Sequence, residues 1–211
     1  MNEVKAKPRR TQRADSARAL RADATRQALL VAARALFAER GYHDVGVRAV
    51  TALAGVTRGA LAHHFTDKEG LFVAVFDAVE RELIADGANR AAASPPPDAW
   101  TGFRAGVQRY LDAVTRPDVQ RITLIDAPAV LGWRRWRKLE EDYSLGALTK
   151  ALAVAMDHGL IRRQAMQPLA HLVLGSVMEA GLVIAHADDP GDCRRAVGGA
   201  LDDLLRGLET P

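Results

Sequence analysis

Hydrophobic residues recur at helical spacing along most of the chain. Between Asp23 and Arg40 the apolar positions step by three and four residues, which is the period of one buried helix face. A second, short segment of this kind runs from about Val47 to Ala54, and a third follows Thr57. The residues expected to face inward are Leu29, Ala33, Leu36, Phe37, Val50, Leu53, Leu61 and Phe65. Because no strand pattern competes with these segments, the sequence predicts an all-α protein.

Two glycines divide this N-terminal region. Gly41 follows the first helix, where a residue in the left-handed conformation commonly ends a helix, and Tyr42 can fold back onto the last turn. Gly55 ends the second helix, and Thr57 can cap the third by accepting a hydrogen bond from a backbone N–H group. A supporting helix followed by helix, glycine turn and helix is the three-helix, homeodomain-like form of the helix-turn-helix.

The rest of the chain is also predicted to be helical. A fourth helix is expected from Thr66 or Asp67 to about Ala92, and the prolines at 95–97 cannot continue it. Further helices are expected at 100–115, 117–126, 133–158, 168–186 and 190–208, with a break at Pro128. The predicted organisation is a basic arm at 1–22, a helix-turn-helix domain at 23–70 and a larger helical domain at 71–211.

Residues 168–187 are apolar over a length that could span a membrane. Glu179, His171 and His186 would be costly in lipid, and the small residues of this segment suit close helix packing, so we expect a buried helix instead. The last helix carries its own apolar stripe, formed by Val197, Leu201, Leu204, Leu205 and Leu208. We expect these two helices to pair with their symmetry mates in a homodimer.

Charge is concentrated at the N-terminus. Residues 1–22 contain seven Lys and Arg against two acidic residues, a net charge of +5, whereas the whole chain carries +3. This arm lacks apolar periodicity and should be disordered in isolation. It can either follow DNA phosphates or serve as a solubilising tail, and composition leaves both open.

The sequence contains no motif of a common enzyme class. G-x-S-x-G, a phosphate-binding loop, a dinucleotide fingerprint and a spaced metal-ligand cluster do not occur. Neighbouring His63 and His64 point about 100° apart on a helix and cannot easily share one ion. We therefore expect no enzyme, no cofactor and no metal. The single cysteine, Cys193, and the lack of a signal-peptide pattern favour the cytoplasm.

Several short motifs lie within residues 25–76. They are F-A-E-R-G-Y at the end of the first helix, V-R-A-V and A-G-V-T around the turn, H-H-F at the end of the third helix and D-K-E-G-L at the start of the fourth. In these motifs the segment resembles the DNA-binding domain of the TetR family of bacterial regulators. The resemblance implies a homodimeric transcriptional regulator that binds double-stranded DNA at a near-palindromic operator, most often a repressor, released by a small-molecule effector. A DNA-binding activator, or a helical small-molecule-binding protein without regulation, remains the alternative.

The first turn of the third helix is the expected reading element. A recognition helix presents its N-terminal turn to base edges in the major groove, and Thr57, Arg58, Gly59 and Ala60 occupy that turn. Arg58 can donate paired hydrogen bonds to guanine N7 and O6, although contact with phosphate alone is the alternative. Gly59 permits a close approach of the backbone to DNA.

Phosphate contacts are expected on both sides of this turn. Arg48 begins the second helix and Lys68 the fourth, and each is interpreted as a phosphate clamp, with solvated surface charge as the alternative. The resemblance adds Thr25 and His63 as contacts to the DNA backbone. It also implies a tyrosine where this chain has Ala62, a departure that would weaken binding or shift the load to neighbouring residues.

The resemblance further implies a cavity for a small, largely apolar effector within residues 98–185. The bulky or polar residues expected near it are Phe103, Val107, Tyr110, Trp133, Trp136, Tyr143, Met178 and Glu179. Each could equally be an ordinary core residue. Glu179 is the most informative of them, because a carboxylate in an apolar helix needs a partner, which could be an arginine, a tyrosine hydroxyl or a donor on the ligand.

Overall fold

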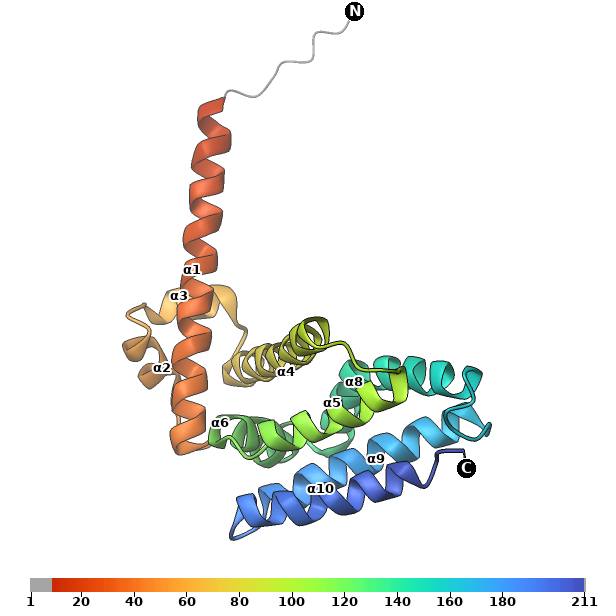
Figure 1. The fold of residues 1–211 in the computed structure, drawn as a ribbon. Helices are drawn as coiled ribbons and strands as arrows, with labels where there is room; N and C mark the ends of the chain where they lie inside the picture. Colours follow the sequence, from red (N-terminus) through yellow and green to blue (C-terminus); the bar gives the residue numbers. More distant parts are fainter. Residues whose placement is uncertain (1–8, 211) are drawn as a thin grey trace, which may run out of the picture. The chain divides into compact units, whose positions relative to one another are not determined.

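The computed structural model describes residues 9–210, with side-chain surroundings from Arg18 onward. In chain order the helices are α1 (Arg9–Arg40), α2 (Val47–Leu53), α3 (Arg58–His64), α4 (Lys68–Ala93), α5 (Ala99–Ala113), α6 (Pro117–Val119), the π-helix η1 (Gln120–Asp126), α7 (Ala127–Leu131), α8 (Trp133–Asp157), α9 (Met166–Ala185) and α10 (Pro190–Arg206) (Figure 1). This confirms the predicted all-α class. Two compact units, Met1–Val75 and Phe76–Pro211, divide the chain inside α4.

The N-terminal unit is built around the buried face of α1. Leu29, Ala33 and Phe37 of this helix are fully buried, as is Val50 of α2. Leu61 of α3 is 4% exposed and completes the same small core. The spacing of apolar residues therefore predicted which face of each helix packs inward.

Both predicted turn glycines adopt the left-handed conformation. The φ angles are +79° at Gly41 and +67° at Gly55, a region that L-residues with a side chain rarely adopt. The Gly41 N–H donates to the Phe37 carbonyl, and the Tyr42 ring lies 5.7 Å from the Phe37 ring. The predicted C-cap and the fold-back of Tyr42 are both confirmed.

Two expectations for this unit differ from the structure. α1 begins at Arg9 rather than Asp23, because the added segment is rich in Ala and Arg, which favour helix without tertiary packing. Its Leu20 is 69% exposed, in keeping with an unpacked extension. Residues 1–8 of the predicted arm lie outside the described residues.

The expectation that Leu53 faces inward was wrong. Leu53 is 58% exposed, because Val50 and Thr51 form the buried face of α2.

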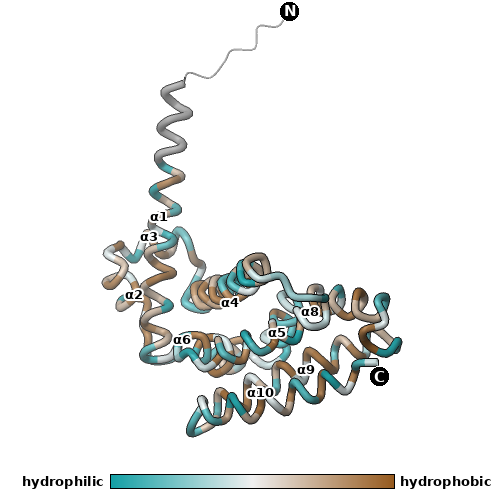
Figure 2. Tube along the Cα trace, in the orientation of Figure 1, coloured by the Kyte–Doolittle hydropathy of each residue, from teal (hydrophilic) through white to brown (hydrophobic). Residues whose placement is uncertain are grey.

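In the C-terminal unit α9 packs against both α8 and α10, and α5 packs against the same two helices (Figure 1). Hydrophobic residues recur along α9 in Figure 2. Among the described residues α9 is also the helix long and apolar enough to cross a membrane by length and composition, yet half of its most apolar window is buried inside this chain. The contacts with α8 and α10 account for that burial without a bilayer.

Polar contacts fix the ends of this bundle. Asp98 caps α5 by accepting a hydrogen bond from the Thr101 N–H at 2.8 Å, and Asp189 caps α10, whose first residue is the predicted Pro190. Arg104 of α5 donates from Nε and Nη2 to the two carboxylate oxygens of Asp202 at 2.9 and 2.8 Å. This paired contact joins α5 to α10.

The chain does not break at Pro128 as expected. Helical structure continues through Pro128 into α7, and the break comes at Gly132, where φ is +76°. In η1 the Ala127 N–H donates to the Ile122 carbonyl, five residues back. The matching donor for the Thr123 carbonyl would be the nitrogen of Pro128, which carries no hydrogen. The Trp136 indole N–H donates to that carbonyl instead, at 3.0 Å, so the helix tolerates the proline.

Candidate functional site

The first turn of α3 lies at the surface of the N-terminal unit. The Thr57 Oγ1 atom accepts a hydrogen bond from the Ala60 N–H at 3.1 Å, which confirms the predicted cap. Thr57, Arg58 and Gly59 are exposed, and Ala60 is half-buried. A methyl group added at Gly59 would meet only the Thr57 Oγ1 atom, at an ordinary 3.8 Å. The fold itself therefore places no steric demand for glycine at this position.

Arg48 and Arg58 border the same hollow. Its volume is about 460 Å³ and its lining is Gly46, Val47, Arg48, Thr51 and Arg58. Both guanidinium groups are exposed, and within residues 18–210 neither forms an ion pair. Since planar guanidinium groups bind phosphate and guanine edges through paired N–H donors, the hollow has the chemistry of a nucleic-acid contact.

The other predicted DNA contacts have different local hydrogen bonds and exposure. Lys68 donates from Nζ to the Tyr42 carbonyl at 2.8 Å. Asp67 caps α4 by accepting a hydrogen bond from the Gly70 N–H at 2.7 Å, which settles the choice between Thr66 and Asp67. The hydroxyl group of Thr25 donates to the Arg21 carbonyl at 2.9 Å. His63 and Ala62 are both exposed on α3, so either position can be reached from outside.

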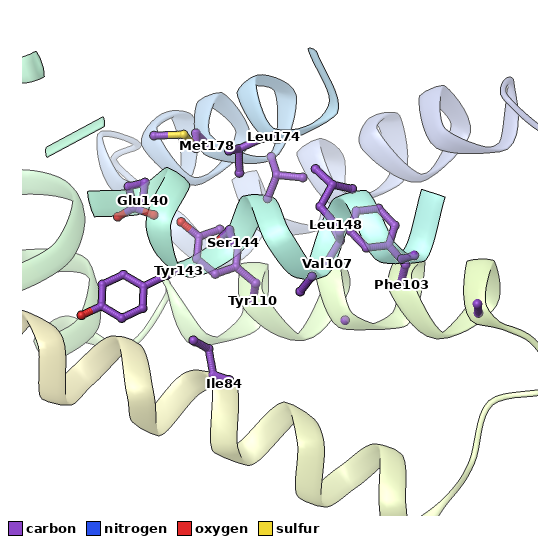
Figure 3. Close-up of a pocket in the computed structure, with 15 residues that line it drawn as sticks. Ile84, Phe103, Val107, Tyr110, Glu140, Tyr143, Ser144, Leu148, Leu174 and Met178 are labelled. Carbon is purple, nitrogen blue, oxygen red and sulfur yellow. The ribbon is translucent and has the colours of Figure 1, made fainter. Parts of the chain in front are cut away.

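A cavity of about 390 Å³ lies within the C-terminal unit, between residues of α4, α5, α8 and α9 (Figure 3). Five of the expected effector residues line it: Phe103, Val107, Tyr110, Tyr143 and Met178. The lining residues that the sequence did not single out are Ile84, Ala99, Gly106, Glu140, Ser144, Ala147, Leu148, Ala151, Leu174 and Val177.

Three expected effector residues lie elsewhere. Trp136 is fully buried, but its N–H group donates to the Thr123 carbonyl and it does not line the cavity. Trp133 is 58% exposed. Glu179 is exposed as well, because it is one step along α9 from the buried Met178 and so points about 100° away from it. A solvated carboxylate needs no buried partner, which removes the reason for placing Glu179 in the cavity.

The buried carboxylate of the cavity is Glu140, which the sequence analysis missed. Glu140 is 4% exposed, and its Oε1 atom is buried with no hydrogen-bond partner in the part of the chain that the structure describes. Its position four residues after Trp136 and four before Ser144 places it on the inward face of α8, but the surrounding run of charged residues masks that signal in the sequence.

Burial changes the protonation of this end of the cavity. Desolvation first, and the charge of Glu80 second, raise the pKa of Glu140 well above its ordinary value. Glu80 of α4 is 6% exposed, and burial raises its pKa to about 7. Burial also raises the pKa of the Tyr110 phenol, with Glu140 and Glu80 adding to the effect. The Tyr143 hydroxyl donates to the Asp77 carboxylate at the adjoining part of α4.

Comparison with known proteins agrees with this arrangement. Residues 29–75 match the family described as bacterial regulatory proteins, tetR family, and residues 100–208 match the tetracyclin repressor-like C-terminal domain. The HTH-type transcriptional repressor AcnR of Corynebacterium efficiens is 30% identical over 155 residues, covering 74% of this chain and 78% of the relative.

Solved structures show the same fold. The crystal structure of a TetR-family transcriptional regulator from Pectobacterium atrosepticum is similar with a TM-score of 0.79 at 35% identity, covering 91% of this chain and 97% of that one. The transcriptional regulator FadR of Bacillus subtilis, in complex with stearoyl-CoA, shares the fold with a TM-score of 0.72 at 16% identity, covering 87% and 99% of the two chains.

The two family matches cover both the DNA-contact surface and the cavity. One includes the helix-turn-helix with its exposed arginines, and the other includes most of the helical unit with the cavity. The family is one of regulators and not of enzymes. The chain therefore belongs to the TetR family of bacterial transcriptional regulators and is a DNA-binding regulator.

Proposed function

We propose that this regulator is a cytoplasmic repressor that binds a near-palindromic operator as a homodimer and leaves it when a small molecule binds. The observation that carries the proposal is the hollow shared by Arg48 and Arg58, whose exposed guanidinium groups form no ion pair within residues 18–210 and border the first turn of α3. Repression is favoured over activation because AcnR, which is similar over most of the chain, is a repressor.

Within this proposal the residues that contact DNA have two different tasks. Arg58 reads a guanine, with Thr57, Gly59 and Ala60 lying against the same base edges. Arg48, Lys68, Thr25 and His63 contact the DNA backbone and fix the register of the reading turn. The two tasks predict different losses, since phosphate contacts add affinity for any sequence and base contacts add discrimination.

The homodimer is supported by apolar residues on the outer faces of the last two helices. Leu172 and Val183 of α9 are 72% and 43% exposed, and Leu204 of α10 is 54% exposed. Leu201 of the predicted stripe is 5% exposed and packs within its own subunit, so the outward part of the stripe is narrower than the sequence suggested. Burying the outward residues against a second copy would remove them from water.

The cavity supports effector control. Its volume of about 390 Å³ lies within the range of small-molecule sites, roughly 300–1,000 Å³. The complex of FadR with stearoyl-CoA shows that a protein of this fold can hold a ligand with a long acyl chain. Binding would favour a conformation in which the two reading turns no longer match successive major grooves, about 34–36 Å apart.

The test begins with operator selection from fragmented genomic DNA by the full-length protein. Affinity for the operator and for its single-base variants is then compared for the wild type, Arg58→Ala and the control Arg134→Ala, an exposed arginine of α8. Arg58→Ala should lose roughly 1–3 kcal/mol of discrimination at one base pair per half-site, and the control should lose none.

Equal losses for Arg58→Ala on operator and random DNA would show that Arg58 contacts only phosphate.

A transcriptional reporter then tests whether the protein represses or activates. Deleting the regulator should raise expression from the operator, whereas a fall would identify an activator. A thermal-shift screen of metabolites, followed by operator release, tests the effector; if no binder dissociates DNA, effector control is wrong.

A further inference from the structure

The effector cavity is apolar except at one end. Figure 3 shows the Glu140 carboxylate at that end and the Phe103 and Leu148 side chains at the other. We propose that the effector is an organic cation, an apolar body carrying a protonated amine or similar group, and that its positive charge binds Glu140. This rests on the function proposed above, since it names the chemical class of that effector.

An unsatisfied acceptor carries the argument. Among the described residues the Glu140 Oε1 atom is buried without a hydrogen-bond partner, although buried polar atoms are normally paired. The Trp136 side chain contributes a hydrogen bond to the same carboxyl group. Glu140 lines the cavity, so a rotation of its side chain that exposes Oε1 would let a ligand N–H group supply the missing donor, and a charged N–H donor forms the stronger, charge-assisted bond.

The charged groups around Glu140 favour a cation over an anion. Glu80 on α4 adds a second buried carboxyl group. Arg137 on α8 is the nearby cation, but its Nε atom already donates to Glu141 at 3.3 Å. Arg109 on α5, whose Nε atom is also buried without a hydrogen-bond partner among the described residues, lines the adjoining pocket with Glu80 and does not line the cavity itself. Among these charged groups, Glu140 is therefore the one that lines the cavity.

The tyrosines of the cavity do not compete for the same role. The Tyr143 hydroxyl donates to Asp77, so its hydrogen is already committed. The pKa of the Tyr110 phenol is raised by burial, so this group stays neutral and can only add a neutral hydrogen bond to a ligand. Glu140 is thus the group of the lining that can carry a full negative charge opposite a bound cation.

Binding of a cation should also release a proton. In the empty cavity burial raises the pKa of Glu140, so the protonated carboxyl group is favoured to a higher pH than in water. A bound cation favours the carboxylate, so the proton passes to the solvent as the ligand enters. Affinity for a cation should therefore increase with pH, by at most about tenfold per pH unit for one proton, until Glu140 is ionised without ligand.

The experiment uses three probes with one tail and different head groups: decylammonium, 1-decanol and decanoate. Isothermal titration calorimetry below the critical micelle concentration gives the affinity of each for the full-length wild type, Glu140→Gln and Asp142→Asn. Asp142 is the matched control, because it is an exposed acidic residue of the same helix, pairs with Lys138 and does not line the cavity. Operator binding and thermal unfolding are measured on the same preparations.

Decylammonium should bind the wild type at least about tenfold more tightly than 1-decanol, and decanoate should bind most weakly. Glu140→Gln should abolish the preference for the cation and leave the affinity for 1-decanol unchanged, while Asp142→Asn keeps the wild-type order. From about pH 6 to about pH 8 the affinity for decylammonium should rise and that for 1-decanol should stay flat. Should Glu140→Gln not fold, Glu140→Met takes its place and should abolish the same preference.

Three results would overturn the proposal. They are tightest binding of decanoate, a cation preference that survives in Glu140→Gln, and no binding of any probe to a folded wild type. These are distinguishable from failure of the regulator itself. A protein that binds its operator but ranks the probes otherwise is a regulator with a different effector class, and one that ranks the probes as expected without binding any operator is a cation-binding protein.

Discussion

Lys68 donates a hydrogen bond from Nζ to the main-chain oxygen of Tyr42 at 2.8 Å, and its ammonium group lies 4.0 Å from the centre of the Tyr42 ring. The contact holds the start of α4 against the segment that follows α1. An ammonium group has three donors, so two remain for a phosphate. The contact to Tyr42 thus orients a cation that stays available to DNA.

Lys68→Ala should therefore have two measurable effects. Loss of the hydrogen bond and of the cation–π contact should lower the free energy of unfolding by about 1 kcal/mol. Binding to the operator and to random DNA should weaken by the same factor, and the slope of log affinity against log salt should become shallower by about one. Lys150→Ala, at an exposed position of α8, is the control. A loss confined to the operator would contradict a phosphate role for Lys68.

Gly59→Ala tests whether glycine is required for DNA rather than for folding. The added methyl group has an ordinary 3.8 Å contact within the chain, and alanine favours helix, so unfolding should shift toward higher temperature. Operator affinity should fall at least about tenfold if the backbone of this turn approaches DNA closely. Gly146→Ala, in the exposed face of α8, should raise stability and leave operator binding alone. Unchanged binding for Gly59→Ala would exclude close approach.

Leu204→Glu tests the proposed dimer without disturbing the subunit core. Leu204 is 54% exposed, whereas a methyl group at Gly181 would lie only 3.1 Å from the Tyr110 hydroxyl, so a charge at Gly181 would disrupt the subunit itself. Sedimentation should show monomers of Leu204→Glu with native circular dichroism and no operator binding. Val31→Glu, at a 68% exposed position of α1, should remain dimeric. A dimeric Leu204→Glu would remove this face from the interface.

Stability should fall as pH rises through the range where Glu80 ionises. Its pKa is raised from 4.5 to about 7 in the folded chain, so the folded state holds this proton more tightly than the unfolded state. The resulting stabilisation is complete below about pH 4.5 and is lost as pH rises through about 7, a change of up to about 3 kcal/mol. Glu80→Gln cannot ionise and should exceed the wild type in thermal stability at pH 8. Chemical denaturation of the wild type and Glu80→Gln at several pH values measures the difference in their free energies of unfolding, with Glu82→Gln as the control. A difference that stays constant with pH would contradict the prediction.

Helical periodicity and turn chemistry were enough to predict most of the N-terminal unit. The positions of Gly41, Gly55 and Thr57 follow from local backbone rules, which act over a few residues and are visible in sequence. The inward face of α2 was assigned less well. Leu53 is apolar and correctly spaced, but a helix of two turns buries only a narrow strip, and the sequence does not reveal its width.

The cavity could be predicted only in part, because its lining comes from four separate helices. Bulky residues such as Phe103 and Tyr110 were predicted to lie near it because the resemblance implies an effector cavity and such cavities have mostly apolar walls. The sequence predicted that Glu179 lies in the cavity and gave no sign of Glu140. An acidic residue in an apolar helix is conspicuous in sequence, whereas an acidic residue among other charged residues is not. Which of the two is buried depends on the rotation of α8 and α9 against their neighbours, and that is set by packing across the whole unit.

The hydrogen bond from Trp136 to the π-helix restricts which substitutions this sequence can accept. Pro128 removes a main-chain donor, and the indole N–H group from the next helix takes its place at the Thr123 carbonyl. With Pro128 present, Trp136→Phe would leave the buried Thr123 carbonyl oxygen without a hydrogen-bond donor. With a residue at position 128 that has an N–H group, the same replacement would destabilise the protein far less. The two positions should therefore be epistatic, so that relatives lacking the tryptophan are expected to lack the proline as well.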